Sequence, residues 1–306
     1  MSDNYNYADA IKVLNKVVEL NPQDAESYSN RGAVYGELGN YQQAIKDYDK
    51  AIELNPQDAE AYSDRGFAYA KLGYYQQAIK DYSKAIELNP QYAKAYSNRG
   101  AVYGELGNHQ QAIKDFSKAI ELNPQFAKAY FNRGIIYAKF GNYQQAIKDY
   151  DKAIELNPQF AKAYYSRGNA YGETGNHQRA IEDYSKSIEL NPQYAMVHNN
   201  RGAVYAKLGN HQQAIKDFSK AIEVDSQDAD AYYNRGNVYD ETGNHQRAIE
   251  DYSKAIEVDP QFADAYYNRG TAYAKIGDNQ AAYADITIAA RLGHESAQNI
   301  LKTQLH

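Results

Sequence analysis

Residues 25–58 read AESYSNRGAVYGELGNYQQAIKDYDKAIELNPQD, and this stretch decides the fold because it recurs along the chain. The dipeptide Arg-Gly returns every 34 residues, at Arg31-Gly32, Arg65-Gly66, Arg99-Gly100, Arg133-Gly134, Arg167-Gly168, Arg201-Gly202, Arg235-Gly236 and Arg269-Gly270. A second glycine and a proline keep the same spacing, and Ser226 is the one break in the proline series. A fixed period of about 20 to 50 residues is typical of a stack of small supersecondary units.

Each repeat predicts two amphipathic helices. In residues 25–58 the apolar positions follow steps of three and four, at Tyr28, Gly32 and Tyr35, then at Ala44, Tyr48, Ala51 and Ile52. Gly39 follows the first helix, where a left-handed cap favours glycine, and Asn40 can cap the second. Asn55 and Pro56 then end the second helix, because proline cannot continue it.

These positions resemble the tetratricopeptide repeat (TPR) family, with eight repeats over residues 25–296. The resemblance implies an all-α fold: a right-handed superhelical solenoid of antiparallel helix pairs with about 18 helices. Residues 1–24 are expected to form an N-terminal half-repeat with only a second-type helix, from Tyr7 to Leu20, and residues 297–306 a C-terminal capping helix. Two features depart from the family pattern. Tyrosine, or His198 in the sixth repeat, stands where tryptophan is frequent, and arginine precedes the first glycine.

The arginine row has two interpretations, a phosphate-binding row or a structural ion pair. Every repeat also carries an aspartate on its second helix, at Asp47, Asp81, Asp115, Asp149, Asp183, Asp217, Asp251 and Asp285. Antiparallel helices would place this aspartate near the arginine. The N-terminal half-repeat lacks the arginine and holds Val13 at the aspartate position. We therefore expect eight buried or half-buried ion pairs.

Composition argues against several functions. The net charge of −6 and a pI of about 5.7 provide no positive field for nucleic acid or anionic lipid. No segment approaches the ~20 apolar residues that span a bilayer, so we expect a cytoplasmic protein without membrane contact. The chain has no cysteine and no phosphate-binding or catalytic motif, so we expect no enzyme, no catalytic residues and no cofactor. The histidines His109, His177, His211 and His245 occupy the same position in different repeats, too far apart to share a metal ion.

The resemblance implies that the first helices line the concave face of the superhelix, where partner peptides bind. Two residues before the repeat glycine stands an asparagine row, made of Asn30, Asn98, Asn132, Asn200, Asn234 and Asn268. An amide both donates and accepts, so this row can bond the backbone of an extended peptide. It can equally bond neighbouring helices or water, and both interpretations stay open.

Two further positions of the first helix are candidates for binding. One carries aromatic residues, Phe131, Tyr165, Tyr233 and Tyr267, whose rings would offer apolar contact area if exposed. The other carries Lys94, Lys128 and Lys162 between repeats that are acidic at this position. The lysines predict an acidic partner segment at the middle repeats, and the alternative is that they are solvated charges without a ligand.

These patterns favour a non-enzymatic protein-protein interaction scaffold that binds an extended peptide or partner segment in the concave groove. The alternative is a self-assembling structural array that oligomerises through the N-terminal half-repeat, whose outer face has no first helix to cover it. A catalytic or metal protein is disfavoured because repeats and caps account for the whole sequence.

Overall fold

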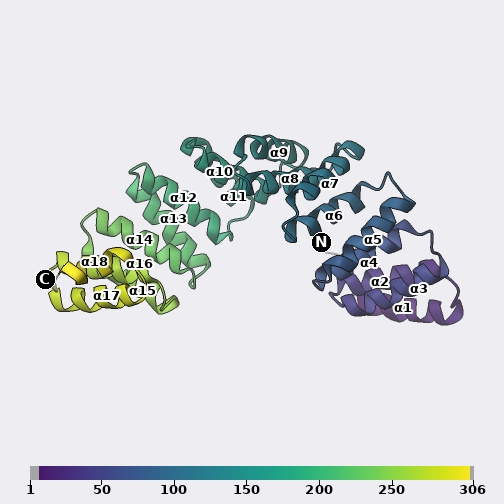
Figure 1. Cartoon of the computed structure of the whole chain (residues 1–306), viewed down its shortest axis with the longest axis horizontal. Helices are drawn as coiled ribbons and strands as arrows, with labels where there is room; N and C mark the ends of the chain where they lie inside the picture. Colours follow the sequence, from purple (N-terminus) through teal and green to yellow (C-terminus); the bar gives the residue numbers. More distant parts are fainter. Residues whose placement is uncertain (1–6, 304–306) are drawn as a thin grey trace. The chain divides into compact units, whose positions relative to one another are not determined.

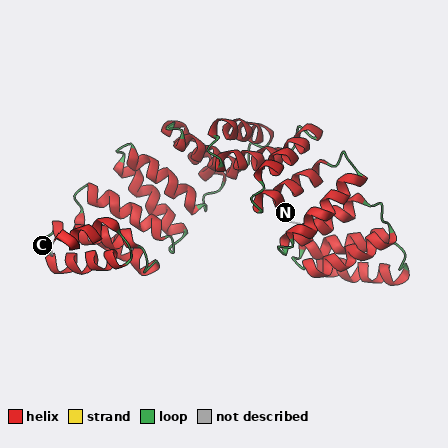
Figure 2. Ribbon diagram, in the orientation of Figure 1, coloured by secondary structure: helices red, strands yellow, loops and turns green. Residues whose placement is uncertain are grey.

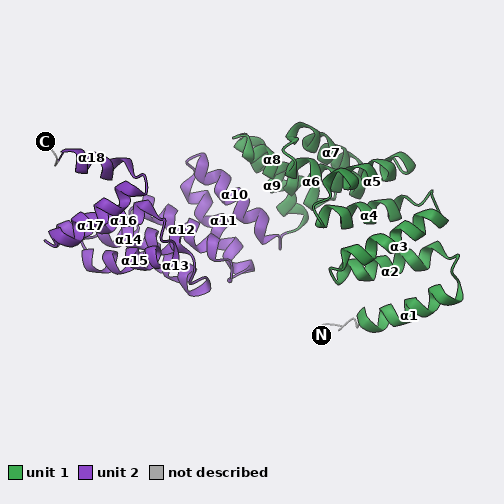
Figure 3. Ribbon diagram, turned by 60° about the horizontal axis from the view of Figure 1, so that its bottom comes forward, with its two compact units in different colours: residues 1–157 green, residues 158–306 purple. Residues whose placement is uncertain are grey.

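The computed structural model describes residues 7–303, and this part of the chain forms 18 α-helices and no strand (Figures 1 and 2). The chain divides into two compact units, residues 1–157 (unit 1) and residues 158–306 (unit 2), which Figure 3 shows in green and purple. The all-α fold and the helix number confirm the sequence prediction.

Unit 1 contains α1 (Tyr7–Leu20), α2 (Ala25–Glu37), α3 (Tyr41–Leu54), α4 (Ala59–Lys71), α5 (Tyr75–Leu88), α6 (Ala93–Glu105), α7 (His109–Leu122), α8 (Ala127–Lys139) and α9 (Tyr143–Leu156). Unit 2 contains α10 (Ala161–Glu173), α11 (His177–Leu190), α12 (Ala195–Lys207), α13 (His211–Val224), α14 (Ala229–Glu241), α15 (His245–Val258), α16 (Ala263–Lys275), α17 (Asn279–Arg291) and α18 (Glu295–Thr303). Within each unit every helix packs on the next one, and each first helix also contacts the first helix of the following repeat. Each unit is therefore a solenoid of stacked helix pairs.

The turns between helices form as the sequence predicts. Gly39 has a φ of 75° after α2, a left-handed conformation that a side chain disfavours. Asn40 caps α3, because its Oδ1 accepts a hydrogen bond from the backbone N–H of Gln43 at 3.3 Å. Asn55 ends α3, with its own N–H still bonded to the carbonyl of Ala51.

Close approach of the two helices in a repeat explains the glycine of the Arg-Gly dipeptide. A Cβ built on Gly134 would lie 2.7 Å from Cε1 of Tyr150, a buried ring on the second helix. Ala146 and Ala153, on the same helix as Tyr150, are fully buried as well. Small residues thus let the helices approach, and the remaining space is filled by one aromatic ring in each of the first seven repeats and by Ile286 in the eighth.

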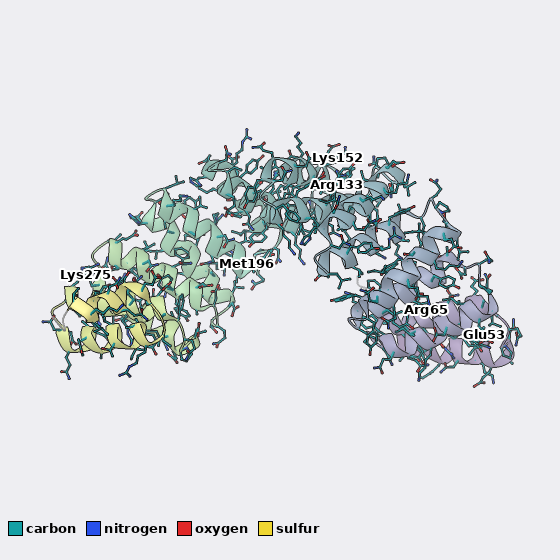
Figure 4. All side chains as sticks on the ribbon, viewed as in Figure 1. Glu53, Arg65, Arg133, Lys152, Met196 and Lys275 are labelled. Atoms are coloured by element: carbon teal, nitrogen blue, oxygen red, sulfur yellow. The ribbon has the colours of Figure 1, made fainter. Side chains whose placement is uncertain are left out.

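All eight expected ion pairs are present. In the fourth repeat, Arg133 donates from Nε to Oδ2 of Asp149 at 2.8 Å and from Nη2 to Oδ1 at 2.7 Å. The same two-point contact joins Arg31–Asp47, Arg65–Asp81, Arg99–Asp115, Arg167–Asp183, Arg201–Asp217, Arg235–Asp251 and Arg269–Asp285. All eight aspartates are buried. Each arginine is therefore held between helices; Arg65 and Arg133 are labelled in Figure 4.

The arginine also connects its repeat to the preceding one, which the sequence analysis did not predict. Nη1 of Arg133 donates to Oγ of Ser117 at 2.9 Å, and Nη1 of Arg65 donates to Asp49 at 2.6 Å. Both acceptors lie on the second helix of the repeat before. One guanidinium thus links three helices and fixes the stacking of repeats.

The two ends of the chain differ in how they are covered. Helix α1 has the predicted bounds and packs on α2, but Val13 is 62% and Leu20 is 75% exposed. At the other end α18 covers α17, with Ala297 in a buried cluster that includes Ile286. Residues 1–6 of the predicted half-repeat and 304–306 of the predicted cap lie outside the described residues.

Candidate binding surface

The predicted site residues lie on what we call the first-helix face. It is formed by α2, α4, α6 and α8 in unit 1, and by α10, α12, α14 and α16 in unit 2. Neighbouring first helices contact each other within each unit, so side chains at one repeat position follow one another along the face.

In unit 2 the asparagine row bonds neighbouring first helices. Asn200 Nδ2 donates to the Tyr165 hydroxyl at 3.1 Å and to Asn169 Oδ1 at 3.2 Å. Two repeats later, Asn268 Nδ2 donates in the same way to the Tyr233 hydroxyl and to Asn237 Oδ1. In the repeat between them, Asn234 Nδ2 donates to Asn199 Oδ1 at 3.1 Å. These amides therefore hold the face together, which agrees with the structural interpretation left open above. Their contact with a partner backbone stays a prediction.

In unit 1 the asparagines are placed differently. Asn30 is exposed, and Asn98 and Asn132 are half-buried beside a cavity of about 240 Å³. Lys128 lines the same cavity, so two predicted amides and one predicted lysine come together there.

The predicted aromatic residues occupy two kinds of environment. Phe131 is only 9% exposed and packs on Tyr150, so it offers little surface, contrary to the exposed ring that we expected. Its ring centroid lies 5.9 Å from that of Tyr150, which is on the second helix of the same repeat. Tyr165 and Tyr233 are half-buried against an aromatic residue of a later loop, with ring centroids 5.2 Å from Tyr194 and 4.8 Å from Phe262 respectively.

The last predicted aromatic residue, Tyr267, is half-buried and stacks on His294. Their ring centroids are 4.1 Å apart and the rings are nearly parallel, at 15°. This contact joins α16 to the turn before α18, so Tyr267 stabilises the C-terminal end of unit 2.

The three predicted lysines are all exposed, but they differ in their partners. Lys94 Nζ lies 3.4 Å from Oδ1 of Asp64 in the preceding repeat. Burial raises the pKa of the Asp64 carboxyl, and Lys94 acts in the opposite direction. Among the described residues no carboxylate pairs with Lys128 or Lys162, so these two ammonium groups are free to meet a ligand.

A cavity of about 760 Å³ opens on the first-helix face of unit 2. Tyr165, Tyr194, Met196 and Phe262 provide its apolar lining, and Asn199 and Asn200 contribute amides. Met196, labelled in Figure 4, is 52% exposed, and its sulfur accepts a hydrogen bond from the Tyr165 hydroxyl. The cavity therefore combines apolar surface with hydrogen-bonding groups.

The loop residues of this cavity were missed by the sequence reasoning, which considered the helices alone. Tyr194 and Phe262 immediately precede first helices, at the repeat position that also holds Asp24, Asp58, Tyr92, Phe126, Phe160 and Asp228. The position holds an acidic residue in some repeats and an aromatic one in others, and this variation was a readable signal.

Two classes of site are not seen in residues 7–303. No group of three or more His, Asp or Glu side chains is placed to hold a metal ion in this part of the chain. None of its helices combines the length and apolar character that crossing a membrane requires.

The stacked antiparallel helix pairs, each locked by an Arg–Asp pair, define the chain as a helical-repeat solenoid. A family model described as tetratricopeptide repeat matches residues 25–58, 93–126, 127–160, 161–194 and 229–262. A second model, described as TPR repeat, matches residues 6–39, 68–107 and 204–243. A third, also described as tetratricopeptide repeat, matches residues 47–80, 184–216 and 252–284. The chain therefore belongs to the tetratricopeptide repeat family.

Solved structures share this fold. A chain of the APC/C hetero-tetramer Cut9–Hcn1 matches with a TM-score of 0.63 at 20% identity, over 87% of this chain and 52% of that chain. This chain thus spans about half the length of that relative. A tetratricopeptide repeat protein from Parabacteroides merdae matches with a TM-score of 0.58 at 22% identity, over 81% of this chain and 98% of that one. No curated protein matches the sequence.

Proposed function

We propose that this protein is a non-enzymatic scaffold that binds an extended segment of a partner protein along its first-helix face. Membership of the tetratricopeptide repeat family supports a role in protein–protein interaction. The observation that carries the proposal is the cavity in unit 2, where two successive first helices, α10 and α12, contribute Tyr165, Met196 and Asn199 to one opening. Apolar area with a few polar groups is what a bound segment requires.

The unit 1 face offers a second contact point for the same kind of ligand. Asn98, Asn132 and Lys128 surround its small cavity, and the ammonium group of Lys128 has no carboxylate partner among the described residues. An acidic side chain of the partner would pair with Lys128, while the amides bond its backbone.

Photo-crosslinking tests this proposal directly. A benzophenone amino acid replaces Asn199, in the unit 2 cavity, or Gln212, an exposed residue of the second helix α13. Some partners will be captured from lysate at position 199 and not at position 212. For these partners, the peptide that carries the crosslink is then identified. We expect one contiguous segment of the partner to be labelled.

A variant of the asparagine row provides the matched comparison. Asn98→Ala/Asn132→Ala/Asn200→Ala/Asn234→Ala should keep the helicity of the wild type but lose the crosslink at position 199. Capture that is equal at both positions would show that the first-helix face is not the site. Capture at position 199 that is unchanged in the variant would show that the asparagine row does not bind the partner.

Self-association is the second candidate function, and the open face of α1 favours it. Val13, Val17 and Leu20 follow helical spacing and are 62%, 37% and 75% exposed. In a full repeat the first helix covers the corresponding positions, and Ala51 there is fully buried. A second copy of the chain could cover this apolar stripe.

A further inference from the structure

The unit 2 cavity has a second property besides its apolar lining, which is its charge. Four carboxylates surround it, from Asp225, Asp228, Asp230 and Asp259, and no lysine, arginine or histidine lines it. Among the described residues no cation forms an ion pair with any of these four aspartates. We call this cavity, with its four carboxylates and its apolar lining, the acidic groove.

Three of the four carboxylates, those of Asp225, Asp228 and Asp230, also act on one another. Burial raises the pKa of the Asp228 carboxyl, and the nearby charges of Asp230 and Asp225 raise it further, while its bond from the backbone N–H of Ala231 acts against this. A group of like charges without a counterion favours the arrival of a cation.

The fold does not require these charges. Asp225 and Asp259 end second helices, where they accept hydrogen bonds from Gln227 N at 3.0 Å and Gln261 N at 2.9 Å. Asn55 makes the same bond from its amide oxygen to Gln57 N at 3.2 Å. An asparagine therefore performs the structural task equally well, and five earlier repeat ends carry one, at Asn55, Asn89, Asn123, Asn157 and Asn191.

The same change occurs on the first helices. The position that carries Lys94, Lys128 and Lys162 in the third to fifth repeats carries Met196 and Asp230 in the next two. A row that is basic earlier in the chain thus becomes apolar and acidic at the groove. Lys162 belongs to α10 but is not part of the groove lining.

We propose that the acidic groove binds an extended segment of a partner protein that carries lysine or arginine side chains between apolar ones. Each cationic head would meet a carboxylate, and its aliphatic stem would lie on Met196 or on the rings of Tyr194 and Phe262. The apolar side chains of the segment would fill the remaining apolar lining. The inference rests on the proposed function and adds the charge of the ligand at this groove.

Fluorescent peptides with blocked termini test the charge preference. Three peptides of about nine residues repeat Lys-Val-Ser, Gln-Val-Ser or Glu-Val-Ser, and their anisotropy is titrated with the full chain at ~0.15 M salt, where long-range attraction is screened. We expect the lysine peptide to bind at least about tenfold more tightly than the other two, because charge-assisted contacts are about twice as strong as neutral ones.

Two charge-matched variants locate the effect. Asp225→Asn/Asp259→Asn places in the groove the residue found at the other repeat ends, and should weaken the lysine peptide by about tenfold. Glu26→Gln/Glu60→Gln removes the same two charges from an acidic cavity of about 430 Å³ in unit 1, which has no aromatic lining, and should change the affinity by less than about twofold.

The outcomes separate this inference from the proposed function. Equal losses in the two variants would mean attraction to net charge and would overturn the inference. If the glutamine or glutamate peptide binds as tightly as the lysine peptide, and Asn199→Ala/Asn200→Ala releases it, the groove binds peptides without preferring cations. If no peptide binds, both proposals fail at this groove.

Discussion

The Arg–Asp pair shows how one residue can serve both the repeat and its neighbour. Arg133 bonds Asp149 through two nitrogens and Ser117 through the third, and it lies 5.8 Å from the ring centroid of Tyr130. Buried charges are costly when unpaired, whereas replacement of the whole pair by apolar residues is often neutral.

A double-mutant cycle measures this coupling. Arg133→Leu or Asp149→Leu alone should lower the free energy of unfolding by about 3–5 kcal/mol, because each leaves a buried charge without its partner. The double variant should recover most of this loss in chemical denaturation. Equal losses in the single and double variants would contradict a pairing role for Asp149.

His198 gives the sixth repeat a pH dependence of its own. It is buried, its Nε2 lies 3.1 Å from the carbonyl of Pro192, and burial is the main cause that lowers its pKa. The folded state therefore binds this proton less readily than the unfolded chain, whose histidine has a pKa of about 6.5. The stability contributed by neutral His198 should be present above pH ~6.5 and lost as the pH falls towards the folded pKa.

Substitution isolates this effect. His198→Tyr introduces the residue that the other seven repeats have at this position. One of these is Tyr232, whose ring centroid lies 5.9 Å from Cζ of Arg235. Between pH 8 and pH 5 the wild type should lose more stability than the variant, as measured by thermal unfolding. Parallel pH profiles would show that His198 does not titrate on unfolding.

At the scale of the helix pair, two glycines of first helices have opposite environments. A Cβ on Gly134 would collide with the ring of Tyr150, whereas a Cβ on Gly36 would meet nothing within 4 Å. Gly134→Ala should lower the free energy of unfolding by about 1–3 kcal/mol, because the added methyl group overpacks the contact between the helices. Gly36→Ala should stabilise by roughly 0.5–1 kcal/mol, because alanine favours the helix.

Chemical denaturation of the two variants checks this pair, with circular dichroism to confirm unchanged helicity. The change in the free energy of unfolding should have opposite signs in the two variants, although both replace glycine by alanine. A stabilising effect at Gly134 would mean that the helices of the fourth repeat can separate without loss, and that close approach does not select glycine there.

At the scale of the whole molecule, the open face of α1 predicts concentration-dependent assembly. Val13→Asp/Leu20→Asp places charges on the exposed stripe and should keep the protein monomeric in light scattering, as should removal of residues 1–20. Leu208→Asp changes an apolar residue of unit 2 that is 51% exposed, and this variant should behave as the wild type. A wild type that stays monomeric at every concentration would exclude assembly through α1.

The sequence by itself determined the helix pairs, their turns and the Arg–Asp contacts. Gly39, Pro56 and Asp47 could be read from the period alone, because each acts on residues of its own repeat at a fixed spacing. The asparagine row could be located in the same way. The hydrogen bonds of this row could not be predicted from the period. Asn200 bonds Tyr165 and Asn169 of the previous repeat, whereas Asn98 has no corresponding tyrosine to bond.

Only the tertiary structure decided which repeated positions are open. Phe131 and Tyr165 share one repeat position, yet the first is buried and the second lines a cavity. That cavity also needs Asp225 and Phe262, which lie in loops of later repeats. A period describes the average surroundings of a position, whereas a binding surface arises where residues from successive repeats differ from that average and meet in space.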